Sequence, residues 1–455
     1  MTRLNSRKSL LAIFFFCTVA AIASSAQTFT TLANLTKDNQ CPMGTLVEGV
    51  NGNFYGLTQN NAVYLNGGSI FVMTAAGSVT TLRSLSLYDG GIASELVLNP
   101  DGTFYGTACC ALYEEWGTAF NISARGTFKV LSRFDKATGQ PDAALRAASG
   151  SYYGTTLNGG PNHAGIVFRM DRTGALTTLY TFCTQSHCPD QGVPLTLIQA
   201  TDGNFYGTGV GNNPVDEGVI FRITPGGSLT TLYTFCTQTG CPDGSWPTSL
   251  MQGSDGDFYG TTQFGGLYYG TIFKITSSGI LTTLHVFCTE TNCPDGSSPV
   301  AMIQATDGNF YGTTNGGFGS IFRMTPSGQL TTLHTFDMTG EFPGPLMQGT
   351  DGNFYGMTSY GGANQDGTVY KLSMGLGPFV KLVQPAGRIG ETGGIIGQGL
   401  TGTTDVSIDG LHASFTVVSD TYIRAIVPAG ATSGFVTVQT PSGILKSNVP
   451  FYVIQ

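Results

Sequence analysis

Short runs of alternating apolar and polar residues cover most of this chain, and each run ends at Gly, Asp or Ser. The stretch from Ser249 to Phe287 holds four of them, "SLMQG", "DFYGTT", "TIFKIT" and "ILTTLHVF", separated by "SDG", by the loop "QFGGLYYG" and by "SSG". Runs of this length that are rich in β-branched and aromatic residues and bounded by turn residues are typical of strands joined by hairpins. The stretch therefore predicts a four-stranded meander.

The same order of runs returns along the chain. The turn and strand "TDGNFYGT" at Thr201–Thr208 has counterparts whose glycines lie 44 to 53 residues apart, at Gly56, Gly106, Gly154, Gly207, Gly260, Gly312 and Gly356. A period in this range indicates a repeat architecture, and it is long enough for about four strands in each unit. The sequence predicts seven copies of the meander.

The two ends of the repeat region complement each other. "TFTTLANL" at Thr28–Leu35 matches the fourth run of the other copies, whereas the last copy ends at "TVYKLS", Thr368–Ser373, without a fourth run of its own. A ring whose last sheet takes its outer strand from the N-terminus leaves no open sheet edge. We therefore predict an all-β fold, a seven-bladed β-propeller of four-stranded blades closed by an N-terminal strand.

The repeat stops after Gly377, and a different pattern follows. "VSIDGLHASFTVVSDTYIRAIVPAG" and the residues after it alternate apolar and polar positions with turn residues every 8 to 12 positions, as in an immunoglobulin-like β-sandwich. The predicted domains are the propeller at residues 27–377 and the sandwich at residues 378–455, after an N-terminal segment 1–26.

Both regions resemble known families. The repeats, with "DGNFYGTT", "GTIFKIT", "LTTLHTF" and "CPDG", resemble the GloVer tandem-repeat family of exported bacterial proteins. The C-terminal region, with "GQGL", "VSIDG", "FTVVSDTYIRAIVP" and "TPSG", resembles an IPT/TIG domain. Neither resemblance implies a particular activity.

The N-terminal segment has the parts of a secretory signal peptide. Arg3, Arg7 and Lys8 precede the apolar run Leu10–Ile22, and small residues end at Ala26, the expected cleavage site. No later run is apolar for ~18 residues, so no transmembrane segment is expected in the mature chain. Its 17 Lys and Arg against 28 Asp and Glu give a formal charge of −11, which disfavours nucleic acid as a partner. We expect a secreted or periplasmic protein.

The cysteines form a repeated pattern. Three C-x4-C-P pairs follow fourth runs, and they predict local disulfides for Cys183 with Cys188, Cys236 with Cys241 and Cys288 with Cys293. A structural zinc site built from the same cysteines is the alternative, but such sites bring two pairs together on one knuckle. Cys41 matches half of the motif, and Cys109 and Cys110 are adjacent. One of these three is expected to be free, with the pairing left open.

Aromatic residues gather in the loops of one predicted face of the ring. The turns of the other face are the tight "DG" and "PSG" kind, whereas this face receives the cysteine loops and the loops between second and third strands. Loop aromatics on one face indicate a contact surface for a glycan or a protein. The predicted ligand-binding residues are Trp116, Trp246, Tyr113, Phe264, Tyr268, Tyr269 and Tyr360.

Other candidate sites have plainer explanations. The repeated Asp of the "DG" turns (Asp202, Asp255, Asp307 and Asp351) supplies one oxygen ligand where a calcium loop needs several, so turn formation explains it. The carboxylate pairs Glu114-Glu115 and Asp216-Glu217 do not show the separation that a glycosidase requires. His285 and His334 stand where sister repeats have Tyr180 and Tyr233, which suggests a strand-surface role.

No G-x-S-x-G, H-E-x-x-H or phosphate-loop motif is present in the sequence. We therefore predict an exported, non-catalytic binding protein, with no catalytic residues, metal or cofactor and with the oligomeric state open. An extracellular lyase or hydrolase that acts on carbohydrate is the alternative, and a structural envelope or matrix protein is the second alternative.

Overall fold

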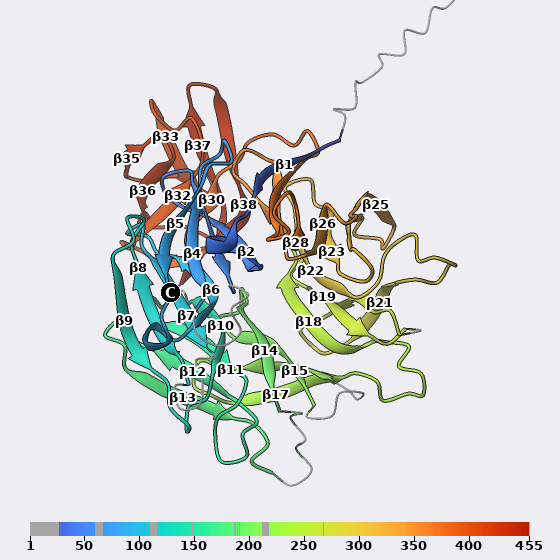
Figure 1. Ribbon diagram of the computed structural model, residues 1–455. Coiled ribbons are helices and arrows are strands. Elements are labelled where there is room, and N and C mark those ends of the chain that lie inside the picture. The colour runs from blue at the N-terminus through green and yellow to red at the C-terminus, as the bar shows by residue number, and fades with distance from the viewer. Residues whose placement is uncertain are drawn as a thin grey trace, which may run out of the picture.

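The computed structural model describes residues 27–59, 67–109, 116–147, 149–185, 188, 190, 192–211, 218–266 and 268–454. The predicted signal peptide lies outside these residues. Within them the chain is all β, apart from two short 3-10 helices, η1 (Lys37–Asn39) and η2 (Leu87–Asp89). The strands form seven repeated sheets, each antiparallel and four strands wide, and two further C-terminal sheets. The repeated sheets are arranged around a common axis in a propeller-like manner (Figure 1).

Each repeated sheet uses its strands in chain order. Neighbouring first strands contact one another, so they lie nearest the axis. The first strands are β2 (Pro42–Glu48), β6 (Ile92–Leu98), β10 (Pro141–Arg146), β14 (Pro194–Gln199), β18 (Ser245–Gln252), β22 (Pro299–Gln304) and the broken pair β26 (Gly340–Pro343) and β27 (Met347–Gln348). The second strands are β3 (Phe54–Thr58), β7 (Phe104–Cys109), β11 (Tyr152–Thr156), β15 (Phe205–Val210), β19 (Phe258–Phe264), β23 (Phe310–Thr314) and β28 (Phe354–Gly361).

The two outer positions are filled in the same way. The third strands are β4 (Ser69–Met73), β8 (Thr118–Ile122), β12 (Ile166–Met170), β16 (Gly218–Ile223), β20 (Thr271–Ile275), β24 (Ser320–Met324) and β29 (Thr368–Ser373). The fourth strands are β5 (Val79–Ser84), β9 (Phe128–Arg133), β13 (Leu176–Thr181), β17 (Leu229–Thr234), β21 (Leu281–Val286), β25 (Leu330–Thr335) and, for the last sheet, β1 (Thr28–Asn34). We number the sheets 1 to 7 by their first strands.

The repeated "FYG" stretch makes the contacts between sheets. In every sheet its second aromatic ring packs against the first aromatic ring of the next sheet, with ring centroids 3.9 to 4.4 Å apart. Tyr355 of sheet 7 meets Phe54 of sheet 1 at 4.3 Å, which closes the circuit. The glycine that follows is required because a Cβ on Gly207 would come within 2.4 Å of the Phe221 ring of the third strand. This is why one chain repeats one short stretch seven times.

A second contact links the inner strands near the "DG" turns. The Gln252 side chain accepts the backbone N–H of Thr201 in the preceding sheet at 3.0 Å, and Gln304 does the same for Ser254 at 2.8 Å. Gln348 repeats the contact with Thr306. At the junction of sheets 7 and 1 the residue is instead Glu48, whose buried carboxylate accepts the N–H and hydroxyl of Thr350 at 2.9 and 2.6 Å.

The predicted closing strand is observed. β1 pairs antiparallel with β29 as the outer strand of sheet 7. Its Phe29 side chain stacks on the imidazole of His334 in sheet 6, with centroids 3.7 Å apart and planes 8° apart. The N-terminal strand therefore joins two sheets from the last part of the chain.

The C-terminal region is a sandwich of two sheets. One has the order β30 (Lys381–Leu382), β32 (Thr392–Ile396), β36 (Tyr422–Ile426) and β35 (Phe415–Ser419). The other has the order β31 (Ala386–Arg388), β38 (Gly443–Ile454), β37 (Gly434–Thr440), β33 (Asp405–Ile408) and β34 (Leu411–His412). Apolar side chains of both sheets form one core between them.

The sandwich packs on the "DG"-turn face of the repeat region. The Thr421 hydroxyl donates to the carbonyl of Val50 in sheet 1 at 2.7 Å, and the Tyr422 hydroxyl donates to the carbonyl of Pro100 in sheet 2. Tyr422 also belongs to an apolar cluster that includes Tyr55 and Phe104. Figure 1 shows the orange and red sandwich beside the blue first sheets. The turn face, featureless in the sequence, is thus a surface on which a domain packs.

Candidate ligand-binding face

Two aromatic pairs occupy equivalent places on the loop face. The first strands of sheets 5 to 7 carry a proline at the same register, Pro247, Pro299 and Pro343, and the residue before it is Trp246 in sheet 5 and Phe342 in sheet 7. Trp246 meets Phe264 edge to face with ring centroids 6.0 Å apart, and Phe342 meets Tyr360 in the same way at 6.0 Å. The structure brings together three of the predicted residues in this way and adds Phe342. The shared position before proline is the sequence signal that would have identified it.

The backbone at these positions is strained. Trp246 and Phe342 have φ values of 58° and 55°, the left-handed region that bulky residues rarely adopt. A following proline disfavours non-extended conformations further. Strain of this kind persists where surrounding contacts hold it, and it concentrates at functional sites.

Hydrogen bonds from the same positions fix the neighbouring loops. The N–H of Phe342 donates to the carbonyl of Phe318 in sheet 6 at 3.1 Å. The corresponding N–H of Ser298 in sheet 6 donates to the carbonyl of Tyr269 in sheet 5 at 2.7 Å. Each loop that carries an exposed aromatic ring is therefore tied to the next sheet before any ligand arrives.

Exposure separates this face from the rest of the molecule. Seven aromatic side chains are exposed among the described residues, and six of them belong to sheets 5 to 7, either in the loops of this face or in the parts of strands beside those loops. Tyr268 is 86% exposed and the others are 37 to 45% exposed. We call the six the aromatic face: Phe264, Tyr268, Tyr269, Phe318, Phe342 and Tyr360.

Three predicted residues fall outside this group: Trp246, which is only partly exposed, Trp116 and Tyr113. Trp116 is partly buried and packs against the apolar cluster that contains Tyr105, Phe134 and Ile166. These contacts are typical of a residue that packs against the core, whereas the sequence predicted an exposed residue that contacts a ligand. Tyr113 lies outside the described residues, as do Glu114, Glu115, Asp216 and Glu217.

Cys41 does not occupy the position that its local sequence suggested. It directly precedes the Pro42 that opens β2, so it stands where Trp246 and Phe342 stand, not in a C-x4-C-P loop. Its buried thiol is free, and burial raises the pKa of that thiol against an opposing effect of the nearby Tyr360 side chain. Cys109 is disulfide-bonded, and Cys110 lies outside the described residues.

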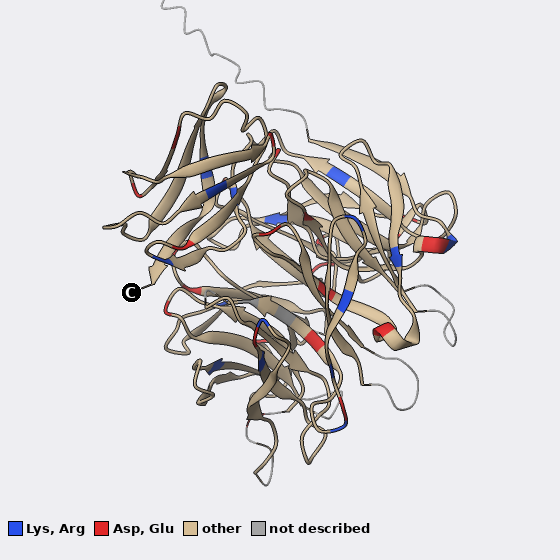
Figure 2. Cartoon of the chain, turned by 90° about the vertical axis from the view of Figure 1, so that its left-hand side faces the viewer, with Lys and Arg blue, Asp and Glu red and all other residues tan. Residues whose placement is uncertain are grey.

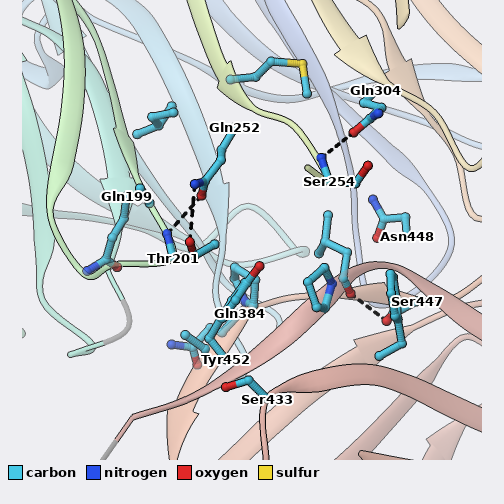
Figure 3. A pocket seen from close by; sticks show the side chains of 18 of the residues that line it. Gln199, Thr201, Gln252, Ser254, Gln304, Gln384, Ser433, Ser447, Asn448 and Tyr452 are labelled. Carbon is cyan, nitrogen blue, oxygen red and sulfur yellow. Dashed lines mark hydrogen bonds between the residues drawn. The ribbon is translucent and has the colours of Figure 1, made fainter. Parts of the chain in front are cut away.

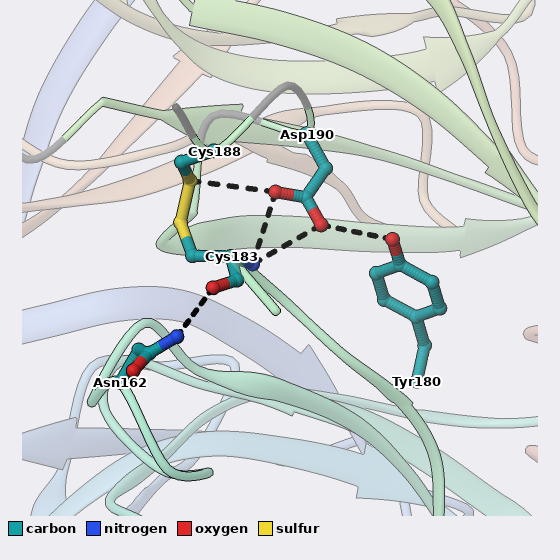
Figure 4. The surroundings of a disulfide bond; sticks show 5 residues. All are labelled: Asn162, Tyr180, Cys183, Cys188 and Asp190. Atoms are coloured by element: carbon teal, nitrogen blue, oxygen red, sulfur yellow. Dashed lines mark hydrogen bonds between the residues drawn. A yellow bond between two sulfur atoms is a disulfide. The ribbon is translucent and has the colours of Figure 1, made fainter. Parts of the chain in front are cut away.

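The three predicted disulfides are present, as Cys183–Cys188, Cys236–Cys241 and Cys288–Cys293. Each loop adds a contact that the sequence did not suggest. The Asp190 carboxylate accepts the N–H of Cys183 at 3.0 Å and the hydroxyl of Tyr180 at 2.8 Å (Figure 4).

The other two cysteine loops repeat this arrangement. The Asp243 carboxylate accepts hydrogen bonds from the N–H of Cys236 and the hydroxyl of Tyr233. The Asp295 carboxylate accepts one from the N–H of Cys288 and shares another with the imidazole of His285. The fourth-strand Tyr or His therefore holds a loop, which is more specific than the strand-surface role expected for it. Among the described residues, one group has metal-ligand spacing, Cys183, Cys188 and Asp190, and its two sulfur atoms are bonded to each other.

The repeated Asp residues of the "DG" turns are occupied within their own turns. Asp202 accepts the N–H of Asn204 at 3.0 Å and the hydroxyl of Tyr206 at 2.9 Å. The same tyrosine contact recurs at Asp255, Asp307 and Asp351. Figure 2 shows charged residues scattered along the chain.

One acidic residue of the inner strands differs from these. Asp142 follows the Pro141 that opens β10, at the loop-face end of that strand. Burial raises the pKa of its carboxyl to about 6. Sequence reasoning missed this residue because a single Asp in a strand carries no motif.

The family is identified by comparison with family models. A model described as the Gloeobacter/Verrucomicrobia repeat matches residues 17–195, 140–340 and 193–410. The chain belongs to the Gloeobacter/Verrucomicrobia repeat family. A comparison with curated proteins gives no match.

Solved structures resemble this Gloeobacter/Verrucomicrobia repeat protein in fold. A streptogramin B lyase is 17% identical with a TM-score of 0.56, and the match covers 76% of this chain and 97% of the lyase. A fungal alcohol oxidase of the AA5 family, in complex with copper, is 12% identical with a TM-score of 0.51, over 94% of this chain and 99% of the oxidase. The extracellular domain of a proposed hybrid two-component system of B. thetaiotaomicron is 10% identical with a TM-score of 0.51, over 95% of this chain and 60% of that chain. At these identities the likeness is one of fold alone.

Two observations indicate an extracellular protein. Disulfides persist in oxidising compartments, and the repeat family points to an extracellular protein. In the described part of the chain, no helix has the length and apolar character needed to cross a bilayer.

Proposed function

We propose that this repeat protein is exported through the signal at residues 1–26 and acts as a non-catalytic binding protein whose aromatic face contacts a glycan or a protein. In this proposal the repeat sheets are the blades of a seven-bladed β-propeller spanning residues 27–377, and residues 378–455 are an IPT/TIG-like domain. Of the seven aromatic rings that are exposed in the described part of the chain, six gather on adjacent sheets, and this observation carries the proposal. Exposed apolar surface that is concentrated in one place marks interaction sites.

The geometry supports a ligand that is flat or extended. The two edge-to-face pairs present rings on sheets 5 and 7, and Phe318 lies on the sheet between them. Aromatic rings offer flat apolar surfaces to the CH faces of sugars or to apolar side chains of a partner. Because the loops are tied to their neighbours, little conformational entropy is lost when the ligand binds.

A binding screen tests the proposal. The purified protein is incubated with insoluble and soluble polysaccharides, and both the bound fraction and the release of reducing ends are recorded. Phe264→Ala and Tyr360→Ala are each expected to weaken binding by about 1 to 3 kcal/mol, the range for an interface hot spot. Tyr88→Ala is the matched control, since Tyr88 is 74% exposed but belongs to η2 between sheets 1 and 2. Equal affinities for all three variants would contradict the proposal.

An extracellular lyase or hydrolase is the second candidate, and Asp142 is the observation that favours it. A carboxyl with its pKa raised to about 6 can donate a proton near neutral pH. Reducing-end release that falls as pH rises through about 6, and that is lost in Asp142→Asn, would establish this activity in place of the non-catalytic role.

A further inference from the structure

A cavity of 1320 Å³ lies between the repeat sheets and the C-terminal sandwich, on the turn face and so opposite the aromatic face. One wall is made by the ends of the first strands and the turns of sheets 2 to 6, including Leu145, Ile198, Met251 and Ala305. The other wall is made by the sandwich (Figure 3). Sequence reasoning placed no site there.

The way the sandwich packs explains the space. Its direct bonds to the repeat region are made to sheets 1, 2 and 7: to Val50, to Pro100 and, from the N–H of Phe379, to the carbonyl of Thr350 at 3.0 Å. The cavity extends from Glu95 and Val97 of sheet 2 to the other side of the axis, under sheets 3 to 6. There the Tyr452 side chain lies beside Thr201 in sheet 4.

Two side-chain amides in the sandwich wall each have one atom without a hydrogen-bond partner. Gln384 is only 6% exposed, lines the cavity, and its Nε2 atom has no hydrogen-bond partner. Asn448 also lines the cavity, and its buried Oδ1 atom has none. A buried polar group without a partner destabilises the folded state. The fold therefore keeps one donor and one acceptor in this wall at a cost to its stability.

The rest of the lining selects against a strongly charged ligand. Two acidic residues, Glu95 and Asp202, are balanced by two basic residues, Arg388 and Lys446. The larger part of the lining is apolar and includes Phe435. The cavity therefore fits an uncharged molecule that has both apolar surface and hydrogen-bonding groups.

We propose that this interdomain cavity binds a short neutral oligosaccharide. A sugar hydroxyl both donates and accepts hydrogen bonds, so it can accept from Gln384 and donate to Asn448, while the CH faces of the ring meet the apolar wall. The volume exceeds the ~300 to 1,000 Å³ of sites that hold drug-sized molecules, which leaves room for several sugar rings. This site is separate from the aromatic face and does not depend on the function proposed for it.

Calorimetry on the full chain tests the cavity. The probes are cellotriose, maltotriose, xylotriose and triacetylchitotriose, with trigalacturonate as the charged comparison. We expect at least one neutral trisaccharide to bind, and Gln384→Leu to weaken that binding at least tenfold. The same substitution is expected to leave the melting temperature unchanged or to raise it, because it replaces an unpartnered donor with an apolar group of similar size. A purely structural Gln384 would give the opposite result, a lower melting temperature with unchanged affinity.

Matched variants locate the ligand. Gln329→Leu changes an exposed glutamine in the turn between β24 and β25 and should leave affinity unaltered. Asn448→Ala provides a second cavity variant and should also weaken binding. The proposal is overturned if no neutral trisaccharide binds or if trigalacturonate alone binds. It is also overturned if affinity survives Gln384→Leu and Asn448→Ala but is lost in Phe264→Ala and Tyr360→Ala, since the ligand would then sit on the aromatic face.

Discussion

At the residue scale, one position of the fourth strand does different work in different sheets. Tyr180, Tyr233 and His285 each bond to an Asp of a cysteine loop at 2.8 Å. His334 occupies the same register but stacks on Phe29 of the closing strand. The substitution of Tyr by His is visible in the sequence, whereas the difference between the two histidines depends on which strand lies beside each.

The imidazole of His334 should make stability depend on pH. Burial lowers its pKa in the folded chain, against an opposing effect of Asp337. As pH falls through about 6.5, the ordinary pKa of histidine, the unfolded chain takes up a proton that the folded chain does not, so the free energy of unfolding falls. His334→Tyr, the residue of sister sheets, should reduce this loss. Urea denaturation at pH 7.5 and pH 5.5 measures it, with His163→Tyr in an exposed loop as control. An unchanged pH dependence in His334→Tyr would contradict the assignment.

Trp116 and Tyr268 should respond in opposite ways to truncation. Trp116 packs against the core, so Trp116→Ala should lower the free energy of unfolding by about 2 to 3 kcal/mol, somewhat less than for a fully buried tryptophan. Tyr268 is 86% exposed, so Tyr268→Ala should change it by less than ~0.5 kcal/mol. Chemical denaturation of the two variants measures these changes in the free energy of unfolding. A stable Trp116→Ala would return Trp116 to the list of contact residues.

At the element scale, the seam between sheets 7 and 1 uses a carboxylate where other seams use an amide. The Glu48 carboxylate accepts two hydrogen bonds from Thr350. At other seams the side-chain amide oxygen of Gln252 or Gln304 accepts one backbone N–H from the preceding sheet. The nearby, partly buried Lys381 of β30 has its pKa lowered by desolvation, and the Glu48 carboxylate opposes that effect. The carboxylate at this seam therefore lies near β30, the first strand of the sandwich.

Substitution at Glu48 tests whether the seam needs an acceptor or a charge. Glu48→Gln keeps an acceptor for the Thr350 N–H, so it should cost less than ~1 kcal/mol of unfolding free energy. Glu48→Ala leaves buried donors unpaired and should cost about 1 to 3 kcal/mol. Thermal and urea unfolding measure the difference. Equal losses in both variants would mean that the pairing with Lys381 is the larger contribution.

The closing strand should be necessary for the repeat region. Deletion of Gln27 to Leu35 exposes the edge of β29 and removes the Phe29 ring from His334, Phe336 and Tyr370. We expect the free energy of unfolding to fall by several kcal/mol, because strand pairing and aromatic burial are lost together. Melting curves of the deleted and intact proteins test this. A deletion without effect would show that sheet 7 is stable with three strands.

At the scale of the whole molecule, the two domains share part of their core. Ile396 and Tyr422 of the sandwich belong to the cluster that holds Leu57 and Phe104 of sheets 1 and 2. A chain cut after Gly377 should therefore stay folded, because the aromatic circuit between sheets is intact, but it should melt a few degrees lower. Circular dichroism together with the melting curve tests both parts. Loss of the β signal would show that the repeat region needs the sandwich in order to fold.

The sequence by itself determined the strands, their order in each sheet, the three local disulfides and the closing strand. It could do so because these depend on residues close in the chain or on exact recurrence. "FYG" occurs in six of the seven copies and "YYG" in the third, and "TFTTLANL" fills the one missing fourth run. The predicted runs of the fifth copy agree with β18 to β21 to within a few residues, the largest difference being that β18 begins at Ser245 and not at Ser249.

Only the tertiary structure decided which aromatic residues are exposed, where Cys41 lies and what covers the turn face. All three features depend on contacts between residues of different sheets. Examples are the contacts between Phe342 and Phe318, between Cys41 and Tyr360, and between Tyr422 and Pro100. Loop composition cannot distinguish Trp116, which a neighbouring core buries, from Tyr268, which no sheet covers. The interdomain cavity has the same origin, because its two walls come from segments that are adjacent only after the sandwich has packed on one side of the ring.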